Sequence, residues 1–275
     1  MNITAKGCLY IVATPIGNLN DISLRAVEVL KLVDIILCED TRNSQYLLNH
    51  YSIDNKKLLS YHKFNEKSRV EDIKRLILNE NKQIALISDA GTPCISDPGR
   101  VLINSLSQTD INIIPIPGPC ALITFLSATY KNDEAFVFLG FLPRTFEAQK
   151  KLILKNCFND IVFYESANRL LKTLDNIRNI LGHDVIVSIG RELTKIYEEI
   201  KTDNIENIID FYKTSILKGE IVVMIHKKDN TYDIFNIDLM NKIEQLKNKG
   251  FSKKDIVTIL VTLYGFNKNE IYDKV

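Results

Sequence analysis

Short apolar runs alternate with amphipathic segments along the first half of the chain. The apolar runs have the length of buried strands and lie at residues 8–12, 34–37, 58–61, 83–88 and 112–116. Between them, Leu24, Val27 and Leu30 recur at helical spacing, and Ser68 with Glu71 forms a capping-box pattern that predicts a helix running to residue 78. This alternation predicts a mostly parallel sheet with helices on both faces.

The second half repeats the alternation with shorter connections. Strands are predicted at residues 136–140, 160–164, 185–189, 198–201 and 220–226, and helices at 146–156 and 168–180. Several connections are too short for a crossover helix, which predicts some antiparallel strands. The break at Pro117-Gly118-Pro119 places a domain boundary there, giving expected domains at residues 1–117 and 118–228.

The last part of the chain, residues 229–275, has a helical pattern only. Three short helices are predicted at residues 238–248, 252–264 and 267–273. Ser252 with Asp255, and Asn267 with Glu270, supply an N-cap and a first-turn acid for the second and third of these helices. We therefore expect a small helical segment after the two α/β domains.

Two of the predicted strands run into loops rich in Gly, Pro and small residues. Residues 83–88 lead into the loop 89–99, and residues 112–116 lead into Pro117-Gly118-Pro119-Cys120-Ala121. In open parallel sheets, ligands bind beyond the carboxyl ends of the strands, where glycine allows close approach to the backbone. Both loops are therefore expected at one binding site.

Composition narrows the class of protein. The chain has 275 residues, 45% of them hydrophobic and 25% charged, with a net charge of +1. This composition is ordinary for a globular protein of two domains, and the net charge neither requires nor excludes a nucleic-acid partner.

Five scattered cysteines without C-x-x-C spacing and four isolated histidines give no metal motif and predict reduced thiols. With no signal-like or membrane-spanning apolar run, we expect a cytoplasmic protein with no membrane partner.

Several motifs of known chemistry are missing from the chain. The sequence contains no G-x-G-x-x-G dinucleotide fingerprint, no Walker lysine loop and no G-x-S-x-G nucleophile elbow. The loops offer backbone amides, small side chains and carboxylates instead. Such a surface suits a ligand that has both a carboxylate and a positive centre, and S-adenosylmethionine has both.

A series of motifs runs along almost the whole chain. In order, they are LYIVATPIGNL (9–19), CEDTR (38–42), SDAGTP (88–93), SDPG (96–99), PGPCA (117–121), FYES (163–166), RELTK (191–195), KGE (218–220), SKKD (252–255) and KNEIY (268–272). This series resembles the motifs of one family, the bacterial 16S ribosomal RNA cytidine 2′-O-methyltransferases. Many motifs in a fixed order make the resemblance specific. It implies the tetrapyrrole methylase-like fold, the class III S-adenosylmethionine methyltransferase fold, in which two α/β domains enclose the cofactor and the protein is a homodimer.

The resemblance also implies a reaction and a set of binding residues. The methyl group of S-adenosylmethionine would move to the ribose 2′-oxygen of a cytidine in the decoding region of 16S ribosomal RNA, within the small ribosomal subunit. The residues expected at the cofactor are Pro15, Asp89, Ala90, Gly91, Thr92, Cys120, Ala121, Tyr164 and Leu193. The residues expected at the RNA are Arg191, Lys195, Lys253 and Lys254, with the C-terminal helices adding RNA or ribosome contacts.

Methyl transfer to a ribose hydroxyl benefits from a positioned base. The candidates for the catalytic site are Glu39, Asp40, Arg42, His62, Glu66, Glu165 and Glu192, and sequence alone does not rank them. Each has a structural alternative: residues 39–42 could form a helix cap with an ion pair, and His62 could be a hydrogen-bonded structural residue. Similarly, Arg191 and Lys195 could pair with Glu192 and Glu198, and the lysines of residues 242–254 could form a solvated face.

Two positions depart from the pattern of the family. Phe64 stands where a second histidine commonly follows His62, and Asn168 stands where a histidine often follows the Glu165-Ser166 pair. Neither missing histidine can be essential in an active protein. Two other functions stay open at this point, a tetrapyrrole C-methyltransferase of the same fold and a noncatalytic ribosome-assembly factor.

Overall fold

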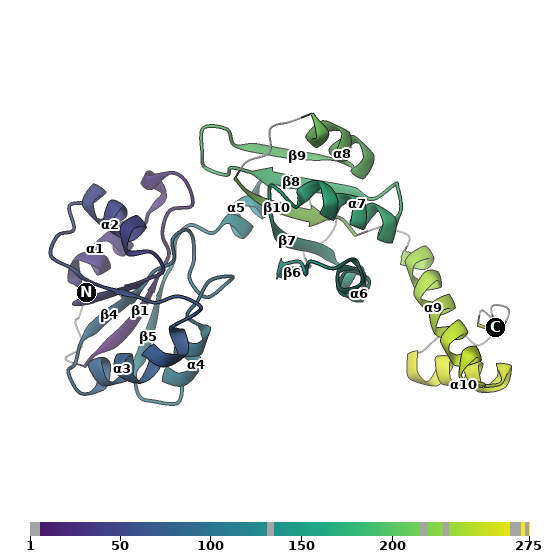
Figure 1. Ribbon diagram of the computed structural model, residues 1–275, viewed down its shortest axis with the longest axis horizontal. Coiled ribbons are helices and arrows are strands. Elements are labelled where there is room, and N and C mark those ends of the chain that lie inside the picture. The colour runs from purple at the N-terminus through teal and green to yellow at the C-terminus, as the bar shows by residue number, and fades with distance from the viewer. Residues whose placement is uncertain (1–5, 131–134, 215–218, 228–230, 265–270, 273–274) are drawn as a thin grey trace.

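A computed structural model of the protein describes residues 6–130, 135–214, 219–227, 231–264, 271–272 and 275, without the side chains of residues 231–238, 241 and 264. Figure 1 shows three parts in a row: a first sheet with its helices, a second sheet with its helices, and a pair of helices at the far end. Within the described ranges, no helix has the length and apolar character that crossing a bilayer requires.

The first sheet is parallel throughout and has the order β3-β2-β4-β1-β5. Its strands are β1 (Cys8–Val12), β2 (Ile35–Cys38), β3 (Lys57–Ser60), β4 (Gln83–Leu86) and β5 (Asn112–Ile116). The central strand β1 pairs with β4 and β5, so that Tyr10 lies opposite Ala85 on one side and Ile114 on the other. The mostly parallel sheet predicted from the sequence is confirmed.

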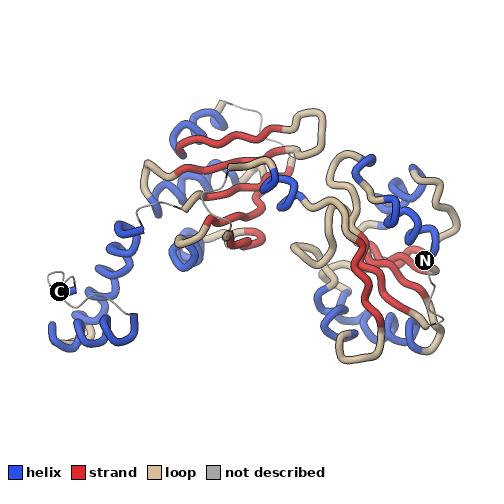
Figure 2. The backbone as a smooth tube through the Cα atoms, turned by 180° about the vertical axis from the view of Figure 1, so that it is seen from behind, coloured by secondary structure: helices blue, strands red, loops and turns tan. Residues whose placement is uncertain are grey.

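Both faces of the first sheet are buried, because side chains along β1 alternate between two cores. Tyr10 and Val12 pack in one cluster with Leu30 of α1 (Leu24–Leu32) and Leu48 of α2 (Thr41–His50). On the opposite face, Leu9 and Ile11 join a cluster with α3 (Glu66–Leu78) and α4 (Arg100–Leu106). Figure 2 shows helices on both sides of this sheet, as expected for strands apolar at every position.

The strand β5 forms one edge of the first sheet and contains a proline. Pro115 lies opposite Ile11 of β1. The carbonyl of Ile116 faces β1, because it accepts a hydrogen bond from the N–H of Ala13 at 3.4 Å. Backbone groups of successive strand residues point to opposite sides of the strand, so the backbone nitrogen and carbonyl of Pro115 point away from β1. The Pro115 carbonyl accepts a hydrogen bond from Arg25 Nη2 at 3.4 Å.

The second sheet is mixed and has the order β6-β7-β10-β8-β9. Its strands are β6 (Phe136–Phe141), β7 (Asp160–Ser166), β8 (Ile186–Arg191), β9 (Glu199–Asn204) and β10 (Glu220–Ile225). β6 and β7 are parallel, and the remaining neighbours are antiparallel, which confirms the predicted antiparallel members. One face is covered by α6 (Phe146–Asn156), α7 (Leu170–Leu181) and α8 (Ile205–Lys213), whose apolar sides form the largest core cluster with this sheet.

The other face of the second sheet is covered by α5 (Ala121–Ser127). Phe125 is fully buried there, among Val162, Val222 and Met224 of the sheet. Ile16, from the loop after β1, belongs to the same cluster. The two halves of the chain therefore share a small apolar contact beside the loops that follow the first sheet.

The C-terminal helices α9 (Thr231–Asn248) and α10 (Lys253–Tyr264) have a core of their own. Leu239, Ile243, Ile256 and Leu260 form it with their neighbours, and no described residue of either sheet belongs to that cluster. The predicted N-cap of α10 is confirmed, since Ser252 Oγ accepts from Asp255 N at 3.3 Å. The helix predicted at residues 267–273 falls largely outside the described residues.

The sequence pattern located the strands to within a few residues, but two predicted helix starts are wrong: α9 begins at Thr231 and not at residue 238, and the start of α3 also differs. The helix α3 begins at Glu66, before the predicted capping box at Ser68, whose hydroxyl donates to Asn65 O at 2.9 Å. The start moves because the amide oxygen of Asn65 accepts from His62 N at 2.8 Å and closes a turn ahead of the helix. The domain boundaries near residues 117 and 228 stay a prediction.

Candidate functional site

Three loops meet at the carboxyl end of the first sheet. The strands β1, β4 and β5 are parallel neighbours, so the segments that follow them emerge at the same edge. Thr14 and Gly91 exchange two backbone hydrogen bonds, of 2.9 Å from Thr14 N and 3.0 Å from Gly91 N. Thr92 Oγ1 donates to Pro119 O at 3.0 Å, which ties the loop after β4 to the loop after β5. These contacts join the three loops into one wall.

A cavity of about 300 Å³ lies between this wall and the second sheet. From the first half it is lined by Ile16, Ala90, Gly91, Thr92, Ile95, Ser96, Asp97, Cys120 and Ala121. From the second half it is lined by Phe141, Tyr164, Glu165, Ser166, Glu192, Leu193, Lys195, Gly219, Glu220, Ile221 and Val222. Apolar side chains and carboxylates dominate this lining, and Lys195 is the one cation among the described residues that form it.

Tyr164 anchors the start of α5 at the cavity. Its phenol oxygen accepts a hydrogen bond from Leu122 N at 3.2 Å, and its ring meets that of Phe138 edge-on at 5.0 Å between centroids. Burial raises the pKa of the Tyr164 phenol. The phenol is therefore neutral at physiological pH and acts as a fixed polar group in the cavity wall.

Glu165 lines the cavity but is held by its own half of the chain. Its side chain is fully buried and accepts hydrogen bonds from Thr173 Oγ1 at 2.7 Å and Ser166 N at 2.8 Å. Arg169 Nε lies 3.4 Å from the same carboxylate. A carboxylate with these partners positions the end of β7, which favours a structural role over that of a base.

Glu192 occupies a tight turn on the opposite side of the cavity. Its φ is 51°, and its carboxylate pairs with Lys195 Nζ at 2.9 Å. Gly219 has a φ of 88°, which favours glycine, and a Cβ there would come within 1.8 Å of Glu192 Oε1 unless that side chain moved. Thr194, in the same turn, accepts a hydrogen bond from Asn18 N at 3.1 Å. The turn thereby joins the second half of the chain to the loop after β1.

Carboxylates from four segments influence one another beside the cavity. Burial, with ionised Asp97 and Asp89 nearby, raises the pKa of Glu39 to about 7. Burial, with Glu220 and Asp89 nearby, raises the pKa of Asp97 to about 6. Glu39 Oε1 is buried and has no hydrogen-bond partner among the described residues. Among the predicted catalytic candidates, Glu39 is therefore the one whose pKa is raised to near neutral and whose carboxylate has an oxygen without a hydrogen-bond partner among the described residues.

Asp40 and Arg42 have the capping arrangement that was the alternative for their motif. Asp40 is the N-cap of α2 and accepts from Arg42 N at 2.8 Å, while Arg42 Nη2 lies 2.7 Å from the second carboxylate oxygen. These hydrogen bonds lower the pKa of Asp40 to about 2. Arg42 itself is exposed, with 90% of its side-chain surface accessible. The structure thus gives both residues a local structural role.

His62 and Glu66 lie in the turn that precedes α3. His62 Nδ1 accepts from Phe64 N at 3.3 Å, and Glu66 accepts from Gly99 N at 3.4 Å. Neither side chain lines the cavity. Phe64, at the position of the missing histidine, is 94% exposed. His62 therefore has the hydrogen-bonded structural role that was its alternative.

A second pocket, of about 210 Å³, adjoins the Thr14–Gly91 contact on its other side. It is lined by Thr14, Pro15, Leu19, Asn43, Ser44, Tyr46, Leu47, Ile87, Ser88 and Asp89. Asp89 accepts hydrogen bonds from Asp40 N and Asn43 Nδ2, both at 3.2 Å. Of the residues predicted at the cofactor, Pro15 and Asp89 thus line this pocket, whereas all the others line the cavity.

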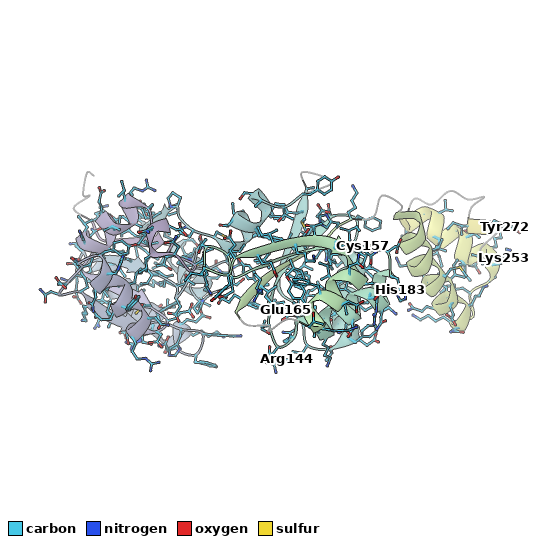
Figure 3. All side chains as sticks on the ribbon, turned by 90° about the horizontal axis from the view of Figure 1, so that it is seen from above. Arg144, Cys157, Glu165, His183, Lys253 and Tyr272 are labelled. Atoms are coloured by element: carbon cyan, nitrogen blue, oxygen red, sulfur yellow. The ribbon has the colours of Figure 1, made fainter. Side chains whose placement is uncertain are left out.

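The predicted RNA-binding residues fall in two separate places. Arg191, at the end of β8, lies 3.5 Å from Glu199 of β9 and is not among the residues that line the cavity, whereas Lys195 is. Lys253 and Lys254 are exposed at the start of α10, and Lys253 Nζ lies 4.6 Å from the ring centroid of Tyr272. Figure 3 shows Lys253 and Tyr272 at the far end of the molecule from the first sheet.

Comparisons with known proteins add to this geometry. Residues 8–209 match the model of the Tetrapyrrole (Corrin/Porphyrin) Methylases. A Rickettsia prowazekii protein called ribosomal RNA small subunit methyltransferase I is 42% identical over 98% of this chain and 96% of its own. A Hydrogenobaculum protein of the same name is 45% identical over 82% of this chain and 97% of its own. The chain belongs to the ribosomal RNA small subunit methyltransferase I family.

Solved structures agree on the fold of this family member. Diphthine synthase superimposes with a TM-score of 0.64 at 14% identity, covering 81% of this chain and 91% of its own. The methyltransferase CobJ gives a TM-score of 0.61 at 14% identity, covering 81% and 95%. The predicted tetrapyrrole methylase-like fold, with its two α/β parts, is confirmed. A Thermus thermophilus uroporphyrin-III C-methyltransferase solved with S-adenosylhomocysteine has a TM-score of 0.56 at 13% identity, covering 79% and 97%.

Family membership makes the protein a methyltransferase that uses S-adenosylmethionine, and the cavity fits that cofactor. Its volume lies at the lower end of the ~300–1000 Å³ typical of small-molecule sites. Ile16, Leu193 and Val222 offer apolar surface for an adenosine, and Asp97 with Glu220 offers negative charge near a cationic sulfur. Gly91, with a φ of 81°, exposes its backbone at the wall. These residues and the backbone of residues 90–92 would hold the cofactor.

Sequence reasoning did not single out every residue of this site. Asp97 and Glu220 lie in motifs of the sequence but are not among the predicted site residues, although both influence charges at the cavity. Gly219 was not singled out either. The available signal was a glycine just before a helix or strand, Gly99 near Asp97 and Gly219 before Glu220. The described residues contain no group of three or more His, Cys, Asp and Glu arranged to hold a metal ion, and none of the five cysteines forms a disulfide.

Proposed function

We propose that the protein transfers the methyl group of S-adenosylmethionine to the ribose 2′-oxygen of a cytidine in the decoding region of 16S ribosomal RNA. The relatives named ribosomal RNA small subunit methyltransferase I support methylation of small-subunit RNA. The observation that supports a ribose oxygen as the acceptor is the environment of the Glu39 carboxylate. A hydroxyl is a poor nucleophile until it loses its proton, and Glu39 has the free oxygen and the near-neutral pKa that accepting this proton requires.

Bound S-adenosylmethionine supplies a methyl group on a positively charged sulfur, which an oxygen can attack in line. The contribution of the chain is then positioning, because alignment of the reacting atoms supplies much of the rate. The Thr14–Gly91 backbone contact separates the cavity from the second pocket and fixes their relative placement. Glu39 follows β2 at the same edge of the sheet, and it is influenced by Asp97 of the cavity and Asp89 of the pocket. Glu39 would accept the hydroxyl proton at a position between the cavity and the second pocket.

The second pocket supports cytidine as the acceptor nucleoside. Tyr46 lines it and is 68% exposed, so its ring offers a stacking surface for a base. The exposed carboxylate of Asp89 can accept a hydrogen bond from the exocyclic amine that distinguishes cytosine. Asn43 donates to Asp89 at 3.2 Å and holds that carboxylate in place. In this arrangement Asp89 binds the substrate rather than the cofactor.

The proposal includes partners and a compartment. The acceptor RNA would be presented within the small ribosomal subunit, and a second copy of the chain would form a homodimer, both in the cytoplasm. The C-terminal helices carry exposed Lys253 and Lys254 and form their own core, which suits an added contact with RNA. Light scattering of the purified protein at several concentrations would measure the number of chains in the assembly.

The decisive experiment incubates purified protein with unmethylated small ribosomal subunits and labelled S-adenosylmethionine. Mass spectrometry of RNA fragments then locates the label, and we expect 2′-O-methylcytidine at one decoding-region position. A label on a base, or on another nucleoside, would contradict the proposal. If calorimetry showed cofactor binding without any RNA product, a tetrapyrrole acceptor would be the next substrate to test. Absence of cofactor binding would instead favour the noncatalytic assembly factor.

A further inference from the structure

A third pocket lies on the second half of the chain, apart from the two already described. Its volume is about 310 Å³, and it is lined by Arg144, Gln149, Asn168, Arg169, Lys172, Thr173 and Asn176. None of these residues lines the cofactor cavity or the pocket at Asp89. The pocket is roughly ten times the ~30 Å³ share of one water molecule in the liquid, so it can take a group of several heavy atoms.

The lining of this third pocket is cationic. Arg144 and Lys172 contribute positive charges, whereas the charge of Arg169 is offset by Glu165, 3.4 Å from its Nε, and no acidic side chain is among the lining residues. Arg169 is fixed by hydrogen bonds from Nη2 to Leu142 O at 2.9 Å and Pro143 O at 3.2 Å. Arg144 and Lys172 are exposed, and neither has an ion-pair partner among the described residues. A concave surface with unpaired cations attracts anions.

Side-chain amides joined by hydrogen bonds form the floor of the pocket. Gln149 is 2% exposed, and its Nε2 donates to Pro143 O at 2.8 Å. Asn176 Nδ2 donates to Gln149 Oε1, also at 2.8 Å. These bonds hold the start of α6 against α7, so the distance between Arg144 at one side and Lys172 at the other is set by buried contacts. The pocket is therefore a feature of the fold and not of two mobile side chains alone.

The pocket adjoins the cofactor cavity through Ser166 and Asn168. Ser166 lines the cavity, and its hydroxyl donates to Asn168 Oδ1 at 2.7 Å. This bond uses the amide oxygen of Asn168 and leaves its Nδ2 as a donor without a partner among the described residues. Figure 3 shows Arg144 at the outer edge of the same part of the molecule as Glu165.

We propose that this third pocket binds a backbone phosphate of the RNA substrate close to the methylated nucleotide. Arg144, Lys172 and the amide of Asn168 supply donors without a competing carboxylate, and phosphate oxygens accept from such groups. The inference rests on the proposed function, because the cavity beside the pocket would hold the reacting groups. The contact positions the strand without reading its sequence. It therefore acts on RNA binding and leaves the chemical step unchanged.

The test removes the two unpaired cations together, as Arg144→Gln with Lys172→Gln. Binding of a fluorescent small-subunit RNA fragment is measured by anisotropy over a range of salt concentrations. Each lost phosphate contact lowers the slope of log affinity against log salt by about 0.7 for a single strand. We expect weaker binding with a shallower slope and a raised KM for RNA, with kcat and the Kd for S-adenosylmethionine unchanged. The thermal midpoint of the variant should equal that of the unaltered protein.

A matched control removes two lysines from the same helix region outside the pocket, as Lys150→Gln with Lys151→Gln. Both are in α6 and outside the lining of the third pocket. Equal effects in the two double variants would assign the loss to net charge and overturn the proposal, as would an unchanged slope for the pocket variant. Binding is measured without turnover, so the result stands even if the unaltered protein fails to methylate RNA. That failure would count against the proposed function alone.

Discussion

The carboxyl groups of Glu39 and Asp97 come from separate loops, and the charge on Asp97 helps to hold a proton on Glu39. Asp97 loses its proton at about pH 6, while Glu39 is still neutral, and Glu39 follows at about pH 7. Near neutral pH, the site therefore contains an ionised Asp97 and a Glu39 poised between its two forms.

Replacing Glu39 by glutamine tests the proposed base. We expect Glu39→Gln to lower kcat for RNA methylation by about 10²- to 10⁴-fold, with cofactor binding by calorimetry unchanged. In the unaltered protein kcat should rise with pH through about 7, as Glu39 becomes ionised, and this rise should vanish in the variant. Glu66→Gln serves as the control. A larger loss in Glu66→Gln than in Glu39→Gln would transfer the role to Glu66.

The raised pKa values of Glu39 and Asp97 also predict a dependence of stability on pH. The folded state holds these protons more tightly than the unfolded state, where the ordinary values are 4.5 and 3.8. Their contribution to the unfolding free energy is therefore complete below about pH 4 and is lost as pH rises to about 7. Urea unfolding of the double variant Glu39→Gln with Asp97→Asn should show a smaller fall over this range. A constant difference from the unaltered protein at every pH would contradict the prediction.

Gly91 tests the wall of the cofactor cavity. Its φ of 81° is strained for any other residue, and a Cβ there would lie 3.3 Å from Ile16 Cγ2. A residue with a side chain in this conformation costs about 1–3 kcal/mol, so Gly91→Ala should displace the wall and weaken S-adenosylmethionine binding by roughly tenfold, measured by calorimetry. Gly250→Ala is the control, with a φ of 83° in the C-terminal helices. Equal weakening in both variants would show that the effect is a general loss of stability.

Phe125 tests the contact between α5 and the second sheet. It is fully buried, and a Cβ at Gly190 would come within 2.5 Å of its ring. Phe125→Ala should lower the unfolding free energy by about 3–5 kcal/mol, measured by urea denaturation. Ile196→Ala, at a side chain 94% exposed, should change stability by less than about 0.5 kcal/mol. A small effect at Phe125 would mean that α5 is not held by this cluster.

Truncation after Lys227 tests the C-terminal helices. Because their core includes no described residue of either sheet, the shortened chain should keep its affinity for S-adenosylmethionine, while RNA methylation is largely lost through a higher KM. The Hydrogenobaculum relative aligns over 97% of its own length but only 82% of this chain. It therefore lacks a part about as long as these helices. Full activity of the truncated protein at low RNA concentration would remove their role in binding RNA.

Local patterns were sufficient to predict the strands and the binding edge. Strands such as β1 and β5 are apolar runs bounded by turn residues, and parallel pairing then brings their loops together. The pattern did not predict α2 or α8, and it misplaced the start of α3. In α3 the local signal at Ser68 competes with a turn closed by Asn65 and His62, and the turn prevails.

The candidate site was predictable only in part, because its electrostatics arise from tertiary contacts. Nothing in the order of residues indicates that Asp97 approaches Glu220, or that the Glu192 carboxylate lies against Gly219. Because Glu39 and Asp40 are adjacent acidic residues, the sequence did not distinguish their roles. The fold separates them, because Asp40 caps α2, while Glu39 Oε1 is buried without a hydrogen-bond partner in the described part of the chain.

Pro115 has a consequence for how copies of this chain can meet. The outward side of β5 is a free edge, which in most sheets could receive a strand from another molecule. At Pro115 that edge has no N–H to offer, and the guanidinium of Arg25 occupies its carbonyl. A second chain could not extend the first sheet at this strand without losing backbone hydrogen bonds. This edge of the first sheet is therefore protected against pairing with a strand of another molecule.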